Sequence, residues 1–231
     1  MLSAFVEISP DLAQALESNS VLITANERLS REYRRAYDLH LQAQGRQAWV
    51  TPSIKSLSRY FLDQYTALRQ ANPDHHPPVL HRSQMLSFAL ELEPEAPRHL
   101  VQNFVSAFET CRGYQIPPSA IKAHHATGSF YYDWSERFLA ATENFIYQQD
   151  IPDVLKASGW QPPVALATVL IEELNTNEHA YFDWACQQTS ISRVDATGVL
   201  RSARQSSDLK DEPNTSAIKI NQAYSTPTSG L

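Results

Sequence analysis

The clearest pattern in the chain is a change of hydrophobic period at Thr24. Residues 20–24 are a short apolar run with β-branched side chains, which is typical of a buried parallel strand. After Thr24 the apolar positions recur at helical spacing, at Leu29, Tyr33, Ala36, Tyr37 and Leu41. Thr24 and Glu27 match a capping box, in which each side chain bonds a backbone N–H at the start of the helix. A buried strand that runs directly into a capped helix is where open α/β folds place their ligands.

The pattern around this unit predicts an α-β-α-β-α order over residues 1–71. A short helix is expected from Ser9 to about Ser18, with Ser9 as its N-cap. A second extended piece is expected at residues 48–50, and a third helix is expected to begin after Ser53. This alternation favours a parallel sheet with helical crossovers.

Residues 72–160 break the alternation and predict an all-helical insertion. After a loop at residues 72–80, no strand is predicted between 82 and 157. The expected helices lie at 83–92, 97–111, 118–124, 129–149 and 151–157. Residues 161–197 return to a β-α-β order, with a strand at 164–171, a helix at 176–188 and a strand at 190–194. We therefore predict a helix-rich α/β domain with a parallel sheet interrupted by a helical insertion.

Composition and charge restrict the function classes. The 231 residues carry a formal net charge of −6, so nucleic-acid binding would require a local basic patch. Two distant cysteines, Cys111 and Cys186, favour neither a disulfide framework nor a zinc site. We expect a cytoplasmic protein without signal peptide or membrane span, because the amino terminus lacks a basic start and no apolar run is long enough. The polar stretch at 198–231 is expected to be mostly disordered.

The segment from 20 to 65 resembles a known family. Its pattern is an apolar strand, Thr24-Ala25-Asn26, Arg28-Leu29 in a basic helix, Gly45, and Trp49-x-Thr51-Pro52 before an amphipathic helix. In this pattern the chain resembles bacterial RecB-family exonuclease-like proteins described as probable DNA repair proteins. These are relatives of the AddB and RecC subunits of helicase–nuclease complexes. Weaker similarity around Trp134 and at 169–184 extends it to about residue 195.

The resemblance implies a helicase-like domain of the P-loop type at the amino terminus of a longer protein. Family members carry a carboxy-terminal PD-(D/E)xK nuclease domain, and no such constellation occurs in this sequence. The chain is therefore expected to be a fragment truncated before the nuclease domain. The acidic pair Glu172–Glu173 stands where the family has an aspartate-containing turn, the Walker B position.

ATP hydrolysis is not expected from these residues. A phosphate loop needs glycines whose N–H groups face the phosphates and a lysine near the β and γ phosphates. The sequence after residue 23 is TANERLSRE, which supplies neither. Glu172 and Glu173 could hold Mg²⁺, but without a phosphate loop a vestigial Walker B-like acidic pair is the favoured interpretation. We expect no cofactor and no catalytic residue in this chain.

The candidate DNA-binding residues lie at the start of the basic helix. They are Asn26, Arg28, Arg31, Arg34 and Arg35. Arginines at this spacing could contact phosphates of single-stranded DNA, with tyrosines of the same helix available for stacking. The alternative is a solvated helix face on which nearby glutamates pair with the arginines.

Other groups favour structural roles. Loop histidines at 75, 76, 81, 124 and 125 lack the further ligands that zinc requires. Trp134, Phe138 and Phe145 have the spacing of a packed helix face. Taken together, we expect a non-catalytic helicase-like region that contributes a scaffold or a single-stranded DNA path. The alternative is a protein-docking module that binds a helicase or nuclease partner subunit and no DNA.

Overall fold

A four-stranded parallel sheet organises the first and last parts of the chain. The computed structural model describes residues 8–17, 20–122, 128–162, 165–169, 171, 173–189 and 191–193. The sheet has the order β2-β1-β5-β6. Its strands are β1 (Val21–Thr24), β2 (Ile54–Ser56), β5 (Leu166–Val169) and β6 (Ile191–Arg193). The chain leaves β1 toward β2 on one side and leaves β5 toward β6 on the other, so the strand order reverses between β1 and β5. The predicted parallel sheet is therefore confirmed.

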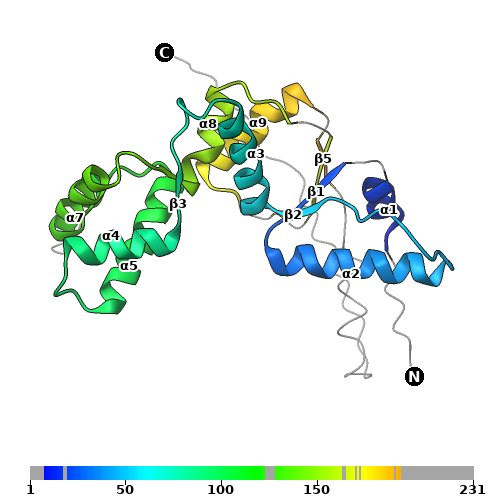
Figure 1. Ribbon diagram of the computed structural model, residues 1–231, viewed down its shortest axis with the longest axis horizontal. Coiled ribbons are helices and arrows are strands. Elements are labelled where there is room, and N and C mark those ends of the chain that lie inside the picture. Colours follow the sequence, from blue (N-terminus) through cyan, green and yellow to red (C-terminus); the bar gives the residue numbers. More distant parts are fainter. Residues whose placement is uncertain are drawn as a thin grey trace, which may run out of the picture.

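Two helical layers cover the faces of this sheet (Figure 1). On β1, Leu22 faces a core shared with α1 (Pro10–Glu17) and α2 (Glu27–Ala43). Val21 and Ile23 face the opposite core, because successive side chains of a strand alternate between faces. That second core is shared with three helices: α3 (Leu57–Ala71), α8 (Ile151–Ala157) and α9 (Thr176–Gln188).

A helical unit that lies between α3 and α8 in the sequence has its own core. It contains α4 (Arg82–Leu92), α5 (Arg98–Gly113), α6 (Pro118–Lys122) and α7 (Gly128–Ala141). Trp134 and Phe138 of α7 are fully buried, and the Trp134 ring stacks on Phe104 with centroids 4.1 Å apart. The predicted packing role of this aromatic series is confirmed, with Phe145 packed at the edge of the same core.

The predicted second strand and third helix are displaced along the chain. Residues 48–50 form no strand; β2 is Ile54–Ser56, and α3 begins at Leu57 with Ser56 as its N-cap. Val50 is 88% exposed, and the Trp49 indole donates to Asp38 at 2.8 Å instead of joining the sheet. The expected helix start after Ser53 is wrong for the same reason, because residues 54–56 pair with β1.

The prediction of one long helix over residues 129–149 is also wrong. Helix α7 ends at Ala141, and β4 (Ile146–Tyr147) and a 3₁₀ turn η1 (Gln148–Asp150) follow. β4 pairs in parallel with β3 (Val79–Leu80), which lies in the segment predicted as a loop. The expectation of no strand between 82 and 157 therefore fails. Helix α8 packs with the sheet-covering helices, although its residues fall in the range expected for the insertion.

Candidate functional site

The connection between β1 and α2 is two residues long and is already hydrogen-bonded. Asn26 is the N-cap of α2, and its side-chain oxygen accepts from the Leu29 N–H at 3.0 Å. The Thr24 hydroxyl lies 2.7 Å from the Ser30 hydroxyl below this turn. The predicted Thr24–Glu27 capping box is wrong, because Thr24 is the last residue of β1. Glu27 instead accepts a hydrogen bond from the Ser56 hydroxyl at 2.5 Å.

Three of the four candidate arginines lie exposed on α2. Arg28 pairs with Glu32 at 2.9 Å while its side chain stays 82% exposed. Arg31 bonds the Glu27 carbonyl on its own helix, and Arg35 is exposed. An exposed ion pair of this kind contributes at most about 1 kcal/mol, so Arg28 can exchange its partner at little cost. We call Arg28, Arg31 and Arg35 the arginine face.

Arg34 has a different position from the arginine face. Its side chain is half-buried and its Nη2 donates to the Ile54 carbonyl of β2 at 2.9 Å. β2 is an edge strand of the sheet. The Ser53 carbonyl faces β1, where it accepts from the Leu22 N–H. Because the backbone groups of successive strand residues point to opposite sides, the Ile54 carbonyl points away from β1. Arg34 thus connects α2 to the outer edge of β2.

A polar pocket of about 430 Å³ lies beside this edge. Lys55 and Arg59 share one carboxylate, Asp63, at 2.9 Å each. With Arg34 and Glu27 the lining carries three cationic and two anionic side chains. The pocket therefore has a small positive excess in a chain whose net charge is −6.

The acidic pair predicted as a vestigial Walker B position is described only in part. Glu172 lies outside the described residues, and Glu173 is exposed between β5 and α9. Within the described ranges, no three His, Cys, Asp or Glu side chains come together as a metal site. Cys111 is buried and Cys186 is exposed.

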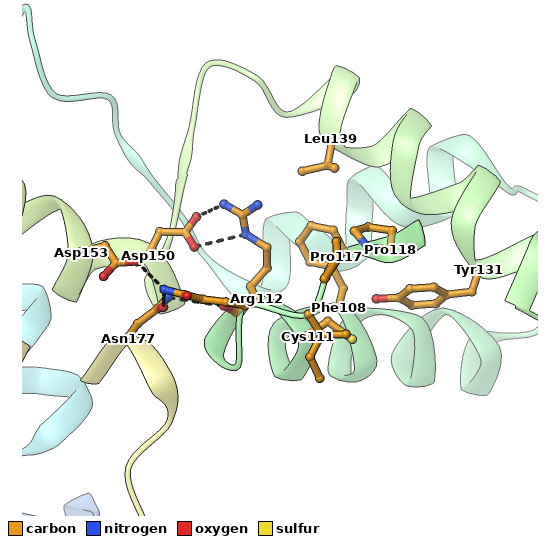
Figure 2. Close-up of a pocket in the computed structure, with 12 residues that line it drawn as sticks. Phe108, Cys111, Arg112, Pro117, Pro118, Tyr131, Leu139, Asp150, Asp153 and Asn177 are labelled. Carbon is orange, nitrogen blue, oxygen red and sulfur yellow. Dashed lines mark hydrogen bonds and ion pairs between the residues drawn. The ribbon is translucent and has the colours of Figure 1, made fainter. Parts of the chain in front are cut away.

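A second pocket lies where the helical unit meets α8 and α9 (Figure 2). Its volume is about 400 Å³. Arg112 at the end of α5 forms a bidentate ion pair with Asp150 of η1. Its Nε donates to Oδ1 at 3.2 Å and its Nη2 donates to Oδ2. The same guanidinium lies over the Tyr147 ring, 5.1 Å from its centroid. These contacts join α5 to the segment that follows β4.

A buried amide completes the junction. Asn177 near the start of α9 is 1% exposed, and its Nδ2 donates to the Gln149 carbonyl at 2.7 Å. Its oxygen accepts from Gln115 Nε2 at 2.7 Å. Gln115 has a φ of +56°, which turns the chain sharply after α5. The two polar groups therefore hold α5, η1 and α9 in one arrangement.

The electrostatics of this junction are dominated by burial. Burial raises the pKa of Asp150 above its ordinary value, and the Arg112 guanidinium opposes only part of that effect. Burial also raises the pKa of Tyr131 on the α7 side of the pocket, and the adjacent Cys111 adds to the increase. The pocket thus combines a low-polarity interior with a few fixed polar groups.

Sequence reasoning did not find the residues of this second pocket. Arg112 and Asp150 are 38 positions apart, and Gln115 and Asn177 are 62 apart. The one local signal was Asn175-x-x-Glu178, a capping box that fixes the start of α9. No spacing rule links these segments.

Comparison with known proteins assigns no family to this chain. No helix in the described part of the chain has the length and apolar character needed to cross a membrane. The chain matches no protein-family model and no curated protein sequence.

Proposed function

We propose that this chain is a non-catalytic, helicase-like α/β domain that supports a single-stranded DNA path in a DNA repair helicase–nuclease relative. The observation that carries the proposal is the arginine face. Arg28, Arg31 and Arg35 are exposed along the first half of α2, which begins where β1 ends beside the reversal of strand order. Open α/β sheets bind ligands at this edge.

The pocket beside β2 supplies further cationic groups next to α2, because Arg34 of that helix lines it together with Lys55 and Arg59. Lys55 and Arg59 share a single carboxylate, so each keeps N–H groups that can reach a phosphate. Phosphate contacts supply most of the affinity in binding that does not depend on sequence. A strand following α2 would meet these groups at the β2–α3 junction.

The β1–α2 connection argues against ATP as a ligand. The Asn26 side chain occupies the Leu29 N–H, which is one of the donors that a phosphate at this helix start would use. The connection has no glycine that would let a phosphate approach the backbone closely. The proposed role is therefore that of a DNA-path element without ATP hydrolysis.

The test is a triple substitution of the arginine face, Arg28/Arg31/Arg35→Glu. Fluorescence anisotropy of a labelled single strand is measured at low and at physiological salt. We expect weaker binding, and a slope of log affinity against log salt that is shallower by about 2, because three phosphate contacts are lost. The matched control is Arg46/Arg98/Lys156→Glu, which changes the same charge at exposed positions elsewhere.

A cooperative melt must first show that both variants are folded. Affinity and slope that are unchanged in the triple variant, or reduced equally in the control, would contradict the proposal. A folded wild-type chain that binds no strand would favour the second candidate, a protein-docking module. One observation supports that candidate: most of the exposed large apolar side chains among the described residues belong to the helical unit or its α5–α6 connection, namely Leu90, Leu100, Tyr114, Ile116 and Phe130.

A further inference from the structure

The pocket at the junction of α5, α7 and α9 has the form of a ligand site. Its volume of about 400 Å³ is within the range of small-molecule pockets. One side is apolar, and Figure 2 shows Leu139 facing Pro117 and Pro118 across the opening. Phe108 and Ile116 complete this apolar lining. A flat, uncharged ring would have apolar contacts on these walls.

The polar groups of the pocket include a donor that is poorly satisfied. The Tyr131 hydroxyl is buried and has no hydrogen bond of normal geometry within the described part of the chain. It does interact with the neighbouring Cys111 and Ser135 side chains, which shift its pKa in opposite directions. In Figure 2 the Tyr131 ring extends from α7 toward Pro117. A buried hydroxyl without a well-formed hydrogen bond costs free energy, so a ligand that accepts its hydrogen bond would be favoured.

Donors and acceptors are both present at the other end of the pocket. The bonds of Arg112 to Asp150 use Nε and Nη2, which leaves Nη1 out of the pair. Asp153 accepts one hydrogen bond, from Gln115 at 3.3 Å, so its carboxylate retains acceptor capacity. A ligand with donor and acceptor atoms on its edge can use both kinds of group.

The charge of the lining selects among ligands. One arginine stands against two aspartates, so a phosphate or carboxylate would face an excess of negative charge. A compact cation would lie beside the Arg112 guanidinium and apolar walls. These groups best fit a neutral, flat heterocycle with hydrogen-bonding edges.

We propose that this pocket binds a nucleobase, carried either by a free nucleoside or by an unstacked base of a single strand. Unstacked bases are commonly bound by stacking on side chains and by hydrogen bonds to their edges. The inference does not depend on the arginine face, because none of its residues lines this pocket. Nucleobase binding in this pocket can therefore be disproved without affecting the proposed DNA path, and the DNA path can be disproved without affecting nucleobase binding.

The test uses saturation-transfer NMR titrations of the full chain with adenosine, guanosine, cytidine and thymidine. Leu139→Trp fills the pocket, and Tyr131→Phe removes the hydroxyl while keeping the ring. Leu90→Trp is the matched control, because it adds the same side chain at an exposed position of α4. Thermal melts establish that each variant is folded.

We expect saturable binding of at least one nucleoside to the wild type and to Leu90→Trp. Leu139→Trp should abolish it, and Tyr131→Phe should weaken it about fivefold, as loss of one hydrogen bond implies. Displacement of the nucleoside by a short oligonucleotide identifies a strand as the source of the base, and failure to displace it identifies the free nucleoside. Absence of saturable binding to the wild type, or unchanged binding to folded Leu139→Trp, would overturn the proposal.

Discussion

Asn26 shows that a side chain singled out for DNA binding already has a structural partner. Its side-chain oxygen satisfies the Leu29 N–H, and its backbone carbonyl accepts from the Ser30 N–H. The sequence pattern predicted the start of α2 to within a few residues, but the predicted N-cap was Thr24 and the observed N-cap is Asn26. That error has a physical cause: both residues are good N-caps, and only the pairing of Thr24 with β2 and β5 decides between them.

We predict that Asn26→Ala lowers the free energy of unfolding by about 1 kcal/mol, because the cap is lost. Asn26→Ser should retain most of the stability, since a serine hydroxyl can bond the same N–H. Urea denaturation of the three proteins measures this. If serine and alanine are equally destabilising, the side chain has another structural role; if serine retains stability but weakens DNA binding, the amide itself contacts the strand.

At the scale of elements, the sequence pattern located most helices and the strands β1, β5 and β6, but it misplaced β2 and missed β3 and β4. Helix α9 has the bounds predicted from the sequence, 176–188, and in the structure an Asn175–Glu178 capping box fixes its start. β2, β3 and β4 have two or three residues each, too few to show an alternation. Their positions are set by partners distant in sequence, such as Ile146 beside Val79. The second pocket was missed for the same reason.

The short β1–α2 connection leads to a prediction about nucleotides. ATP with Mg²⁺ should leave the melting temperature unchanged, because a ligand that does not bind the native state cannot stabilise it. Differential scanning fluorimetry over a concentration series tests this, with a single-stranded oligonucleotide as the comparison ligand. A dose-dependent rise with ATP would show that a phosphate site exists despite the Asn26 cap.

At the scale of the whole molecule, the Arg112–Asp150 pair joins the helical unit to the layer of helices on the sheet. The folded-state pKa of Asp150 is raised above its ordinary value of 3.8. The native protein therefore binds the proton of the Asp150 carboxyl group more strongly than the unfolded chain does. The resulting stabilisation is fully present below the unfolded pKa and is lost as pH rises through the folded pKa.

We therefore predict a pH-dependent difference between the wild type and Asp150→Asn, which cannot titrate. As pH falls from about 7 to about 4, the free energy of unfolding of the wild type should rise relative to that of the variant. Urea denaturation of both proteins across this range measures the difference. If the free energy of unfolding of the wild type instead stays constant or falls relative to that of Asp150→Asn on acidification, Arg112 offsets the burial of Asp150 completely.

The contact between Arg34 and the Ile54 carbonyl has a consequence for self-association. The outer strand of a sheet offers unpaired backbone groups on which another chain can add a strand, and natural proteins protect such edges. Here a guanidinium from α2 occupies the outward carbonyl of a three-residue strand, and Pro52 just before it has no N–H to offer. Arg34 therefore works against aggregation at this edge. Removing it would expose a template for intermolecular pairing, whereas removing Arg28, Arg31 or Arg35 would not.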